Sequence, residues 1–519
     1  NPYIETNCLS ARWVEECIWS YRRFFNVPQE ALKGRSWLYF ERLDLVAAIV
    51  LNGQEIGRQN NSFYPCRIEI TGKLKSDRNL LTVHLDSGLF YVSEKSAEGY
   101  GMSPDAKLHK RHWLRKPQCQ FGWDWSTRLI NIGITGSVRL EWTTDPVRVD
   151  SFTPLASLSE DWRTGTVHGR FFVEGLTPKT VKGKLTLAMP EIGQKVVTDI
   201  DIKPGFNVIE SNVHIINPTL WWPVGHGKQK LYKICASLSV AGKTIAEHSK
   251  EIGFRHIRIN QEKHPQNGRY FTIEINGRKI FAKGGNFVPV DMIFVNTTRK
   301  RYNKVINLAL ESNFNMLRVW GGGLYESNDF YELCDQYGIH VWQDFMFAGG
   351  MIPTDEAFFQ NVKQEVIEQV QRLRKYRCIV LWCGNNENIW GFNEWWNGQY
   401  DFPDSRLKLG GRTIYSYILP EVCMEMDFER PYWPGSPYGG TYPNSESAGD
   451  CHWWSPGTMN KDVHRRYKHE IYDECKSRFV SEYGVIGPCH LESYQQFLKP
   501  EELYLSSKAW RVHTNKFEG

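Results

Sequence analysis

The pattern of apolar and polar positions divides the chain into two kinds of structure. Up to about Pro146, short apolar runs such as WSYRRFF and NLLTVHL alternate with polar residues, and turn signals such as Asn52-Gly53 separate them. Similar runs, among them VKGKLTLAMP and FNVIESNVHI, continue to about Arg258. Alternation with a period of two is typical of strands that bury one face. It predicts two antiparallel sandwiches, a jelly roll over 1–146 and an immunoglobulin-like β-sandwich over 147–258.

From about residue 259 the period changes, and helical patterns alternate with short apolar runs. Helices are predicted over 297–313, 329–337 and 358–376, and runs such as IHVWQDF and CIVLWC lie between them. Continuous β-branched and aromatic runs of this length are typical of strands that are buried on both faces. Strands that alternate with helices predict a parallel sheet, here a (β/α)8 TIM barrel over 259–519.

Seven strand candidates are found in this last part, and the seventh is RFVSEYG. A helix is predicted over 492–504, and no eighth strand follows before Gly519. Because a closed barrel needs its last strand, we expect the barrel to be truncated at its C-terminal end. The opening Asn1-Pro2-Tyr3 has no Met and no signal-like segment, so we expect the jelly roll to be incomplete at its N-terminal end.

Composition excludes several classes of function. No run of eighteen apolar residues suggests a membrane span, and a net charge of +5 without basic clusters does not indicate nucleic-acid binding. The 12 Cys form no C-x-x-C pair, which favours reduced thiols and a cytoplasmic protein. The alternative is a lysosomal, vacuolar or secreted protein whose signal has been removed. The 20 Trp suit a cleft for carbohydrate, because indole faces stack on sugar rings.

Polar groups that can hold a polyol follow almost every predicted strand of the barrel. In chain order they are Asn286, Arg318, Trp320, Gln343, Asp344, Asn386, Glu387, Asp450, His452, Trp454 and Glu482. In α/β barrels the carboxyl ends of the strands meet at one face, where the chemistry takes place. For the stretch GNNE alone, the alternative is that Asn-Asn-Glu caps the next helix.

Two glutamates, Glu387 and Glu482, are predicted to face each other across the barrel mouth. Paired carboxyl groups are what glycoside hydrolysis requires, and in a retaining enzyme one is the nucleophile and the other the acid and base. We expect Glu387 to be the proton donor and Glu482 the nucleophile, with Arg318 keeping Glu482 ionised. Asn386 is expected to donate to the sugar 2-hydroxyl. For either glutamate alone, the alternative is an ion pair at the barrel rim.

Seven motifs occur in an order that carries a resemblance. They are FGWDW, KGGNFVP, LRVWGGG, VWQDF, GNNE, GDCHWW and FVSEYG. Together with the order of the three domains, they resemble the β-mannosidases of glycoside hydrolase family 2. The resemblance implies the same roles for Glu387, Glu482 and Asn386.

The resemblance also assigns residues that the pattern leaves open. Asp124 could be an ordinary loop carboxylate between two indoles, or it could reach into a neighbouring domain. The resemblance implies that it reaches the hydroxyl groups of the terminal sugar, and that Trp320, Trp395 and Trp454 wall the pocket.

The expected function is therefore a retaining glycosidase that removes terminal β-D-mannose from oligosaccharides or glycans. Its expected partner is that glycan substrate, and neither a metal nor another cofactor is required. The alternatives are an endo-β-mannosidase acting on glycoproteins, an exo-β-glucosaminidase or galactosidase of the same family, and a catalytically inactive carbohydrate-binding protein. The sequence does not specify an oligomeric state.

Overall fold

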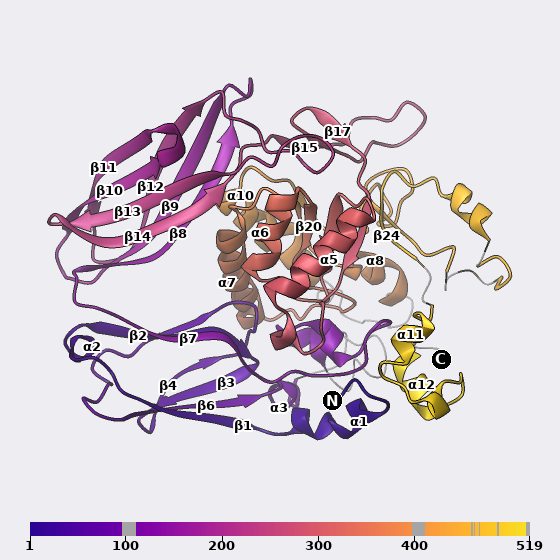
Figure 1. Ribbon diagram of the computed structural model, residues 1–519, viewed down its shortest axis with the longest axis horizontal. Coiled ribbons are helices and arrows are strands. Elements are labelled where there is room, and N and C mark those ends of the chain that lie inside the picture. The colour runs from indigo at the N-terminus through magenta and orange to yellow at the C-terminus, as the bar shows by residue number, and fades with distance from the viewer. Residues whose placement is uncertain are drawn as a thin grey trace.

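Figure 1 shows the computed structural model of the chain, in which two β-sandwiches flank a part where strands alternate with helices. The structure describes residues 1–95, 110–396, 410–457, 460, 462–466, 468–484 and 487–514. The two ends of the chain meet, because the backbone N–H of Glu5 donates to the carbonyl of Phe497 at 2.8 Å. No helix among the described residues is both long enough and apolar enough to cross a membrane.

The first sandwich has one sheet of order β1-β6-β3-β4 and a second of order β5-β2-β7, and all pairings are antiparallel. Its strands are β1 (Trp19–Phe25), β2 (Arg35–Asp44), β3 (Val46–Leu51), β4 (Gln54–Gln59), β5 (Cys66–Glu69), β6 (Asn79–Asp86) and β7 (Gly133–Thr143). Helices α1 (Asn7–Ser10), α2 (Gln29–Lys33) and α3 (Leu89–Val92) are short. Asn52 and Gly53 both have positive φ, 53° and 86°, as a two-residue hairpin turn requires. The predicted sandwich is confirmed.

The second sandwich packs a sheet of order β12-β9-β8 on one of order β11-β10-β13-β14. Its strands are β8 (Val147–Leu158), β9 (Thr164–Gly175), β10 (Val181–Met189), β11 (Gln194–Ile202), β12 (Gly205–Ile216), β13 (Tyr232–Val240) and β14 (Lys243–Ile252). Every second residue of β10 and β13 is buried in the core between the sheets, including Leu185, Leu187 and Ile234. This sandwich is confirmed as well.

The seven strands that the sequence predicts in the third part are all present there. Five form a parallel sheet in chain order: β18 (Gly284–Phe287), β19 (Met316–Val319), β20 (His340–Asp344), β21 (Ile379–Cys383) and β22 (Tyr432–Trp433). The other two, β23 (Cys451–Trp453) and β24 (Val480–Tyr483), form a separate parallel pair. Within the described ranges no eighth strand joins the two sheets, so the closed barrel stays a prediction.

Helices follow the parallel strands, and the longer ones, α5 (Arg299–Glu311), α6 (Asn328–Tyr337), α7 (Glu356–Leu373) and α10 (Leu419–Met426), pack around the sheet (Figure 1). The helices α8 (Asn388–Gly391) and α9 (Gly410–Thr413) are short. The last two, α11 (Leu491–Tyr494) and α12 (Lys508–Thr514), lie away from the sheet, beside the N-terminal segment (Figure 1). In α7, Val362, Val366 and Val370 recur on one face and are fully buried, as the spacing predicts. The single helix predicted over 492–504 is wrong, because α11 already ends at Tyr494 and the extended Lys499 before Pro500 prevents a continuous helix through this stretch.

The sequence pattern did not predict a small antiparallel sheet that covers part of the parallel sheet. This sheet consists of β15 (Ile257–Asn260), β16 (Thr272–Ile275) and β17 (Arg278–Ile280). Its isoleucines, among them Ile273 and Ile275, pack against Trp342, Val380 and Leu381 of the parallel strands. The strands are therefore buried on both faces, which explains their continuous apolar character.

A buried ion pair joins the first sandwich to α7. Arg115 donates to both carboxylate oxygens of Glu365, at 2.9 and 2.7 Å, and to the carbonyl of Met346 at 2.9 Å. Asn61 and Tyr325 also donate to Glu365. The pair is almost free of solvent, with the Arg115 side chain 3% and Glu365 0% exposed.

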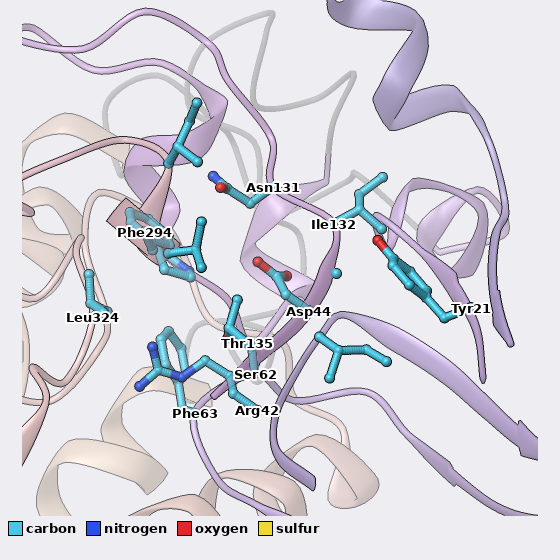
Figure 2. Close-up of a pocket in the computed structure, with 15 residues that line it drawn as sticks. Tyr21, Arg42, Asp44, Ser62, Phe63, Asn131, Ile132, Thr135, Phe294 and Leu324 are labelled. Carbon is cyan, nitrogen blue, oxygen red and sulfur yellow. The ribbon is translucent and has the colours of Figure 1, made fainter. Parts of the chain in front are cut away.

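A cavity of about 220 Å³ lies between the first sandwich and the third part of the chain (Figure 2). Its wall combines apolar Phe63, Phe294 and Leu324 with the polar side chains of Arg42 and Asp44. Its lining includes none of the polar groups at the strand ends. The cavity is therefore separate from the predicted site.

The ion pair between the first sandwich and α7 generates a stability prediction. Arg115→Ala leaves the Glu365 carboxylate buried without its cation, so we expect a loss of about 3–5 kcal/mol in the free energy of unfolding. Equilibrium urea unfolding followed by tryptophan fluorescence measures it. Arg58→Ala is the matched control, because the Arg58 side chain is 74% exposed in its pair with Glu55 and should change stability by less than about 0.5 kcal/mol. Equal effects of the two substitutions would contradict the prediction.

Candidate active site

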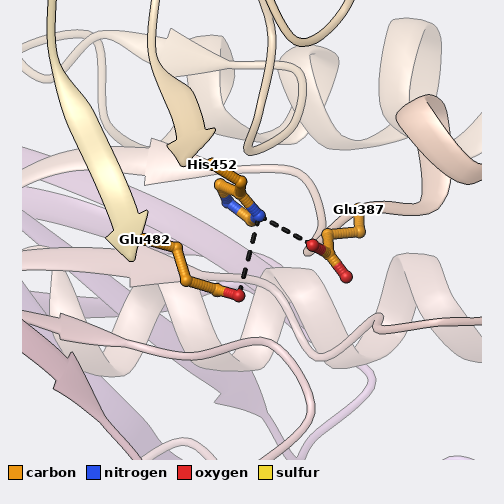
Figure 3. Close-up of side chains that lie close together, drawn as sticks. All are labelled: Glu387, His452 and Glu482. Carbon is orange, nitrogen blue, oxygen red and sulfur yellow. Dashed lines mark hydrogen bonds and ion pairs between the residues drawn. The ribbon is translucent and has the colours of Figure 1, made fainter. Parts of the chain in front are cut away.

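The structure brings Glu387 and Glu482 together at the carboxyl ends of the parallel strands. Glu387 lies four residues beyond the end of β21, and Glu482 lies in β24. One carboxylate oxygen of each glutamate and a ring nitrogen of His452 all lie within 4.8 Å of one another. Figure 3 shows the imidazole of His452, on β23, between the two carboxylates. His452 is paired with Glu482 in the register of the two strands.

The backbone after β21 fixes the position of Glu387. The N–H of Glu387 donates to the carbonyl of Ser436 at 2.8 Å, and the N–H of Ser436 donates to the carbonyl of Asn385 at 2.9 Å. Gly384 is required there, because a Cβ atom would lie 2.2 Å from the carbonyl oxygen of Pro434. Glu387 itself has a φ of 61°, an uncommon value for a residue with a side chain.

Only part of the GNNE motif caps the next helix. The side-chain oxygen of Asn385 accepts from the backbone N–H of Asn388 at 2.9 Å, at the start of α8. Its amide nitrogen donates to the carbonyl of Pro434. Glu387 occupies the N-cap position, but its side chain makes no capping hydrogen bond. Because Asn385 supplies that bond, the side chains of Asn386 and Glu387 are available to the site.

Arg318, on β19, connects the polar groups of several strands. It donates to Glu482 at 3.0 Å and to Asp344 at 2.8 Å. It also donates to the side-chain oxygens of Asn386 at 2.8 Å and Asn286 at 3.2 Å. Its side chain is only 4% exposed, so these contacts replace water as its partners. Arg318 therefore holds Glu482 in one orientation and supplies the positive charge beside it.

The carboxylate of Asp344, predicted to bind the sugar, is hydrogen-bonded to other groups of the protein. Its side chain is 0% exposed. Besides Arg318, the indole N–H of Trp342 donates to it at 2.9 Å and the backbone N–H of Gly321 at 3.0 Å. We therefore interpret Asp344 as a residue that positions Arg318 rather than one that contacts a sugar.

Burial sets the protonation of the three central groups. Burial raises the pKa of Glu387 to about 7, although Arg318 and Asn386 act to lower it. Burial also raises the pKa of Glu482, while His452 and Arg318 oppose the rise. Burial lowers the pKa of His452 to about 4, so its imidazole is neutral at neutral pH. Near neutral pH the site therefore contains a glutamic acid that can carry a proton and a second glutamate that is paired with a guanidinium.

Glu387, His452 and Glu482 are also close enough to hold a metal ion. Two features of the site favour another interpretation. Arg318 already donates to Glu482, and a second cation there would be repelled by the guanidinium. Nδ1 of His452 lies 2.8 Å from Oε1 of Glu387, which is the distance of a shared proton. We interpret the group as an acid–base cluster.

The FGWDW loop of the first sandwich reaches this part of the molecule. The rings of Trp123 and Trp125 lie 4.8 and 5.7 Å from the ring of Trp320, which directly follows β19. The backbone N–H of Cys119 also donates to the carbonyl of Gly322 at 3.0 Å. Asp124 is therefore placed beside the strand ends by two indoles that pack edge-on against Trp320.

The other two predicted tryptophans lie on different segments around the cluster. Trp395, in the short π-helix Phe392–Trp396, contacts Trp390 at 4.7 Å, and Trp390 lies 6.2 Å from His452. Trp454 follows β23 and lies beside Gly484, just beyond β24. Indole rings therefore lie on the segments that follow β19, β21 and β23.

Sequence reasoning missed one residue of the cluster, Ser436. Its hydroxyl lies 3.0 Å from Nε2 of His452 and 2.6 Å from Oδ2 of Asp450. Ser436 follows the two-residue strand β22 in the stretch PYWPGSP, where a serine is typical of any turn. Nothing in the sequence distinguishes it from a turn residue. His452, predicted to bind the sugar, has both ring nitrogens in contact with protein groups.

Two families match the sandwich parts of the chain. Residues 1–136 match the family described as glycosyl hydrolase 2 galactose-binding domain-like, and residues 147–255 match glycosyl hydrolases family 2. Beta-mannosidase B of Aspergillus terreus is 34% identical over 100% of this chain and 61% of its own length. The beta-mannosidase of Capra hircus is 32% identical over 93% of this chain and 56% of its own length. The chain thus spans about three fifths of the length of the curated relatives it matches.

Two solved structures are similar along almost the whole chain. The beta-D-mannosidase from Dictyoglomus thermophilum superposes with a TM-score of 0.90 and 33% identity over 100% of this chain and 62% of its own. An exo-chitosanase of Amycolatopsis orientalis shares the fold, with a TM-score of 0.70 and 16% identity over 97% of this chain and 55% of its own. From the matched sandwiches, the relatives and the paired glutamates, we conclude that the chain belongs to glycoside hydrolase family 2.

Proposed function

We propose that this protein is a retaining glycoside hydrolase that removes terminal β-D-mannose from oligosaccharides or glycans. The observation that carries the proposal is the spacing of Glu387 and Glu482, whose nearest carboxylate oxygens lie within 4.8 Å. Retaining enzymes keep the two carboxyl groups roughly 5–5.5 Å apart, whereas inverting enzymes separate them by roughly 6.5–9.5 Å to admit a water molecule. The shorter spacing supports direct attack by one carboxylate on the sugar.

The surroundings of each glutamate support its role. Arg318 donates to Glu482 and favours its ionised form, as a nucleophile needs. The raised pKa of Glu387, about 7, suits a group that first donates a proton and later accepts one. In the first step Glu387 protonates the glycosidic oxygen while Glu482 forms an ester with the anomeric carbon. In the second step water attacks that carbon, Glu387 takes the water proton, and Glu482 leaves.

The preference for mannose rests on similarity and on the polar groups around the pair. Both curated relatives and the Dictyoglomus thermophilum structure bear the name of a mannosidase. Arg318 holds the side-chain oxygen of Asn386, so its amide N–H groups are what Asn386 can offer to a sugar 2-hydroxyl. Asp124 is the acid that the first sandwich brings to the site, where it can accept from hydroxyl groups of the terminal sugar.

We also propose that the seven parallel strands belong to a (β/α)8 barrel that bears the site at the carboxyl ends of its strands. The order β18 to β22 and the parallel pair of β23 and β24 support this arrangement. The first sandwich would then close one side of the pocket through its FGWDW loop, and the second would support the barrel from outside. A pocket closed in this way fits removal of single terminal sugars.

A substrate panel tests the sugar specificity. We expect kcat/KM for 4-nitrophenyl β-D-mannoside to exceed the values for the β-glucosaminide and the β-galactoside by at least about tenfold, which is 1.4 kcal/mol of transition-state stabilisation. Higher activity on either of the other two sugars would overturn the mannosidase proposal. Release of an intact mannose-containing disaccharide from a glycan would instead point to endo action.

Substitution of the two glutamates tests their roles. Glu482→Ala and Glu387→Ala should each lower kcat by several orders of magnitude, because each step needs both groups. Azide should restore turnover in both variants and give opposite products, the α-azide with Glu482→Ala and the β-azide with Glu387→Ala. Glu421→Gln, at a side chain that is 62% exposed on α10, is the matched control and should keep the normal rate. Azide products of the same configuration would show that the roles are assigned wrongly.

The shifted pKa values generate a pH prediction. As pH rises through about 7, Glu387 loses the proton that it must donate, so kcat/KM should fall along an alkaline limb near that pH. The acid limb, where Glu482 becomes protonated, should lie above the ordinary glutamate value of about 4.3. Arg318 lowers the pKa of both glutamates, so Arg318→Gln should move both limbs to higher pH by roughly one unit or more. Circular dichroism checks that the variant is folded. If both limbs of its pH profile stayed at the same pH, the charge of Arg318 would not be what sets the pKa values of the two glutamates.

A further inference from the structure

A row of hydrogen-bonded, buried polar side chains leads from Glu387 through His452 and Ser436 to Asp450. Nδ1 of His452 lies 2.8 Å from Oε1 of Glu387, and Nε2 lies 3.0 Å from the hydroxyl oxygen of Ser436. That hydroxyl lies 2.6 Å from Oδ2 of Asp450. Ser436 and Asp450 are fully buried, and His452 is 2% exposed. Each contact must therefore satisfy a donor and an acceptor within the protein.

Asp450 determines the direction of these hydrogen bonds. It accepts from the indole of Trp433 at 2.7 Å, the backbone N–H of Tyr438 at 3.0 Å, and the hydroxyls of Ser436 and Ser481 at 2.6 and 2.5 Å. Only a carboxylate accepts at every one of these positions. The hydroxyl oxygen of Ser481 also lies 3.1 Å from that of Ser436. The single proton of the Ser436 hydroxyl points at Asp450, 2.6 Å away, since a bond to a charged acceptor is the shorter and stronger one.

The direction of the Ser436 hydroxyl in turn fixes the tautomer of His452. Because Ser436 gives its proton to Asp450, its oxygen accepts from the imidazole, and the imidazole proton lies on Nε2. Nδ1 of a neutral imidazole then has a lone pair and no proton. Across the 2.8 Å contact, the proton must come from the carboxyl group of Glu387.

We propose that Asp450 and Ser436 are positioning residues that hold His452 in its Nε2–H tautomer, so that Nδ1 accepts the proton of Glu387 and keeps this glutamate in its acid form. The inference rests on the proposed function and deepens it, because it explains how Glu387, the acid of the first step, is kept protonated. When Glu387 has given its proton to the leaving oxygen, the lone pair of Nδ1 faces a carboxylate. This contact favours the return of a proton, which the attacking water supplies in the second step.

The charged and titratable groups around the pair agree with this arrangement. Glu482 lies 3.7 Å from Nδ1 of His452 on one side, and Asp450 lies behind Ser436 on the other. Arg318 bonds to Glu482 and Asp344, and neither Glu387 nor His452 accepts from it directly in the bonds observed. Burial lowers the pKa of His452 to about 4 and raises that of Glu387 to about 7, so the shared proton belongs to the carboxyl group.

The opposite tautomer makes different predictions. If Nδ1 carried the proton, His452 would donate to a Glu387 carboxylate and would lower its pKa. The Ser436 hydroxyl would then point at Nε2, and Asp450 would lose one of its donors. The two arrangements differ in a proton position that can be observed without any turnover.

Nitrogen-15 NMR of the chain labelled at histidine tests the proposal directly. His452→Gln identifies the His452 signals by their loss. We expect Nε2 to show the shift of a protonated nitrogen and Nδ1 that of an unprotonated one, and Ser436→Ala to reduce or reverse this difference. Ser436→Thr, which keeps a hydroxyl, should preserve it. Ser445→Ala is the matched control, because among the described residues the Ser445 hydroxyl is hydrogen-bonded to the hydroxyl and the backbone N–H of Ser447 and to no group of the cluster. A protonated Nδ1 in the unchanged chain would overturn the proposal.

Kinetics give a second readout that a purely structural role would not produce. In Ser436→Ala the imidazole is free to donate from Nδ1 to Glu387, so the alkaline limb of kcat/KM should move to lower pH by roughly 0.5–1 unit. The rate on 4-nitrophenyl β-mannoside should fall more than that on the 2,4-dinitrophenyl glycoside, whose leaving group needs little acid assistance. An unmoved limb would overturn the role of Ser436. If no glycoside were cleaved at all, the proposed function would fail, while the tautomer measured by NMR would still decide the inference.

Discussion

The buried guanidinium of Arg318 is the constraint on which the site depends. A charge that is removed from water is costly unless it is paired and fully hydrogen-bonded. Arg318 meets this requirement with two carboxylates, Asp344 and Glu482, and with the side-chain oxygens of Asn286 and Asn386. These partners come from strands or strand ends that are distant in sequence. Satisfying one cation therefore gathers the polar ends of β18, β20, β21 and β24 around a single point.

The same constraint separates the behaviour of the two glutamates. Glu482 shares a hydrogen bond with the guanidinium, whereas Glu387 contacts a neutral imidazole at 2.8 Å. Both are largely removed from water, with side chains 12% and 16% exposed. Burial raises both pKa values; His452 and Arg318 oppose the rise at Glu482, which also bonds directly to the guanidinium. The nearest partners of these two chemically identical side chains thus differ in charge, which is the basis of the different roles that we propose for them.

Much of the fold follows from local pattern, because burial imposes a period on the sequence. The alternation in VKGKLTLAMP and the four-residue spacing of Val362, Val366 and Val370 both correspond to observed buried faces. Features that depend on distant contacts were not predictable in this way. The sheet of β15 to β17 is recognised only by what its isoleucines cover, and Pro500 divides a helix that composition alone favours.

The same distinction holds within the site. Arg318 and Glu387 could be recognised because they lie in or just after the buried strands β19 and β21, where polar residues are unusual. Glu482 could be recognised because it lies in a short predicted strand, although β24 is only half-buried. Ser436 could not be recognised, because its contacts with His452 and Asp450 depend on the conformation of a loop, which no local sequence pattern predicts. Asp344 was recognised by its place at the end of a strand, but only the structure shows that its oxygens are bonded to Arg318, Trp342 and Gly321, which favours a positioning role.

The close approach of Glu387 and Glu482 implies, on our proposal, hydrolysis with retention of configuration. Proton NMR of the sugar product in the first minutes of hydrolysis, before mutarotation, distinguishes retention from inversion. We expect the β-anomer of the released sugar to appear first and the α-anomer to follow slowly. Initial release of the α-anomer would contradict it, because inversion requires a water molecule between carboxylates that this structure holds too close together.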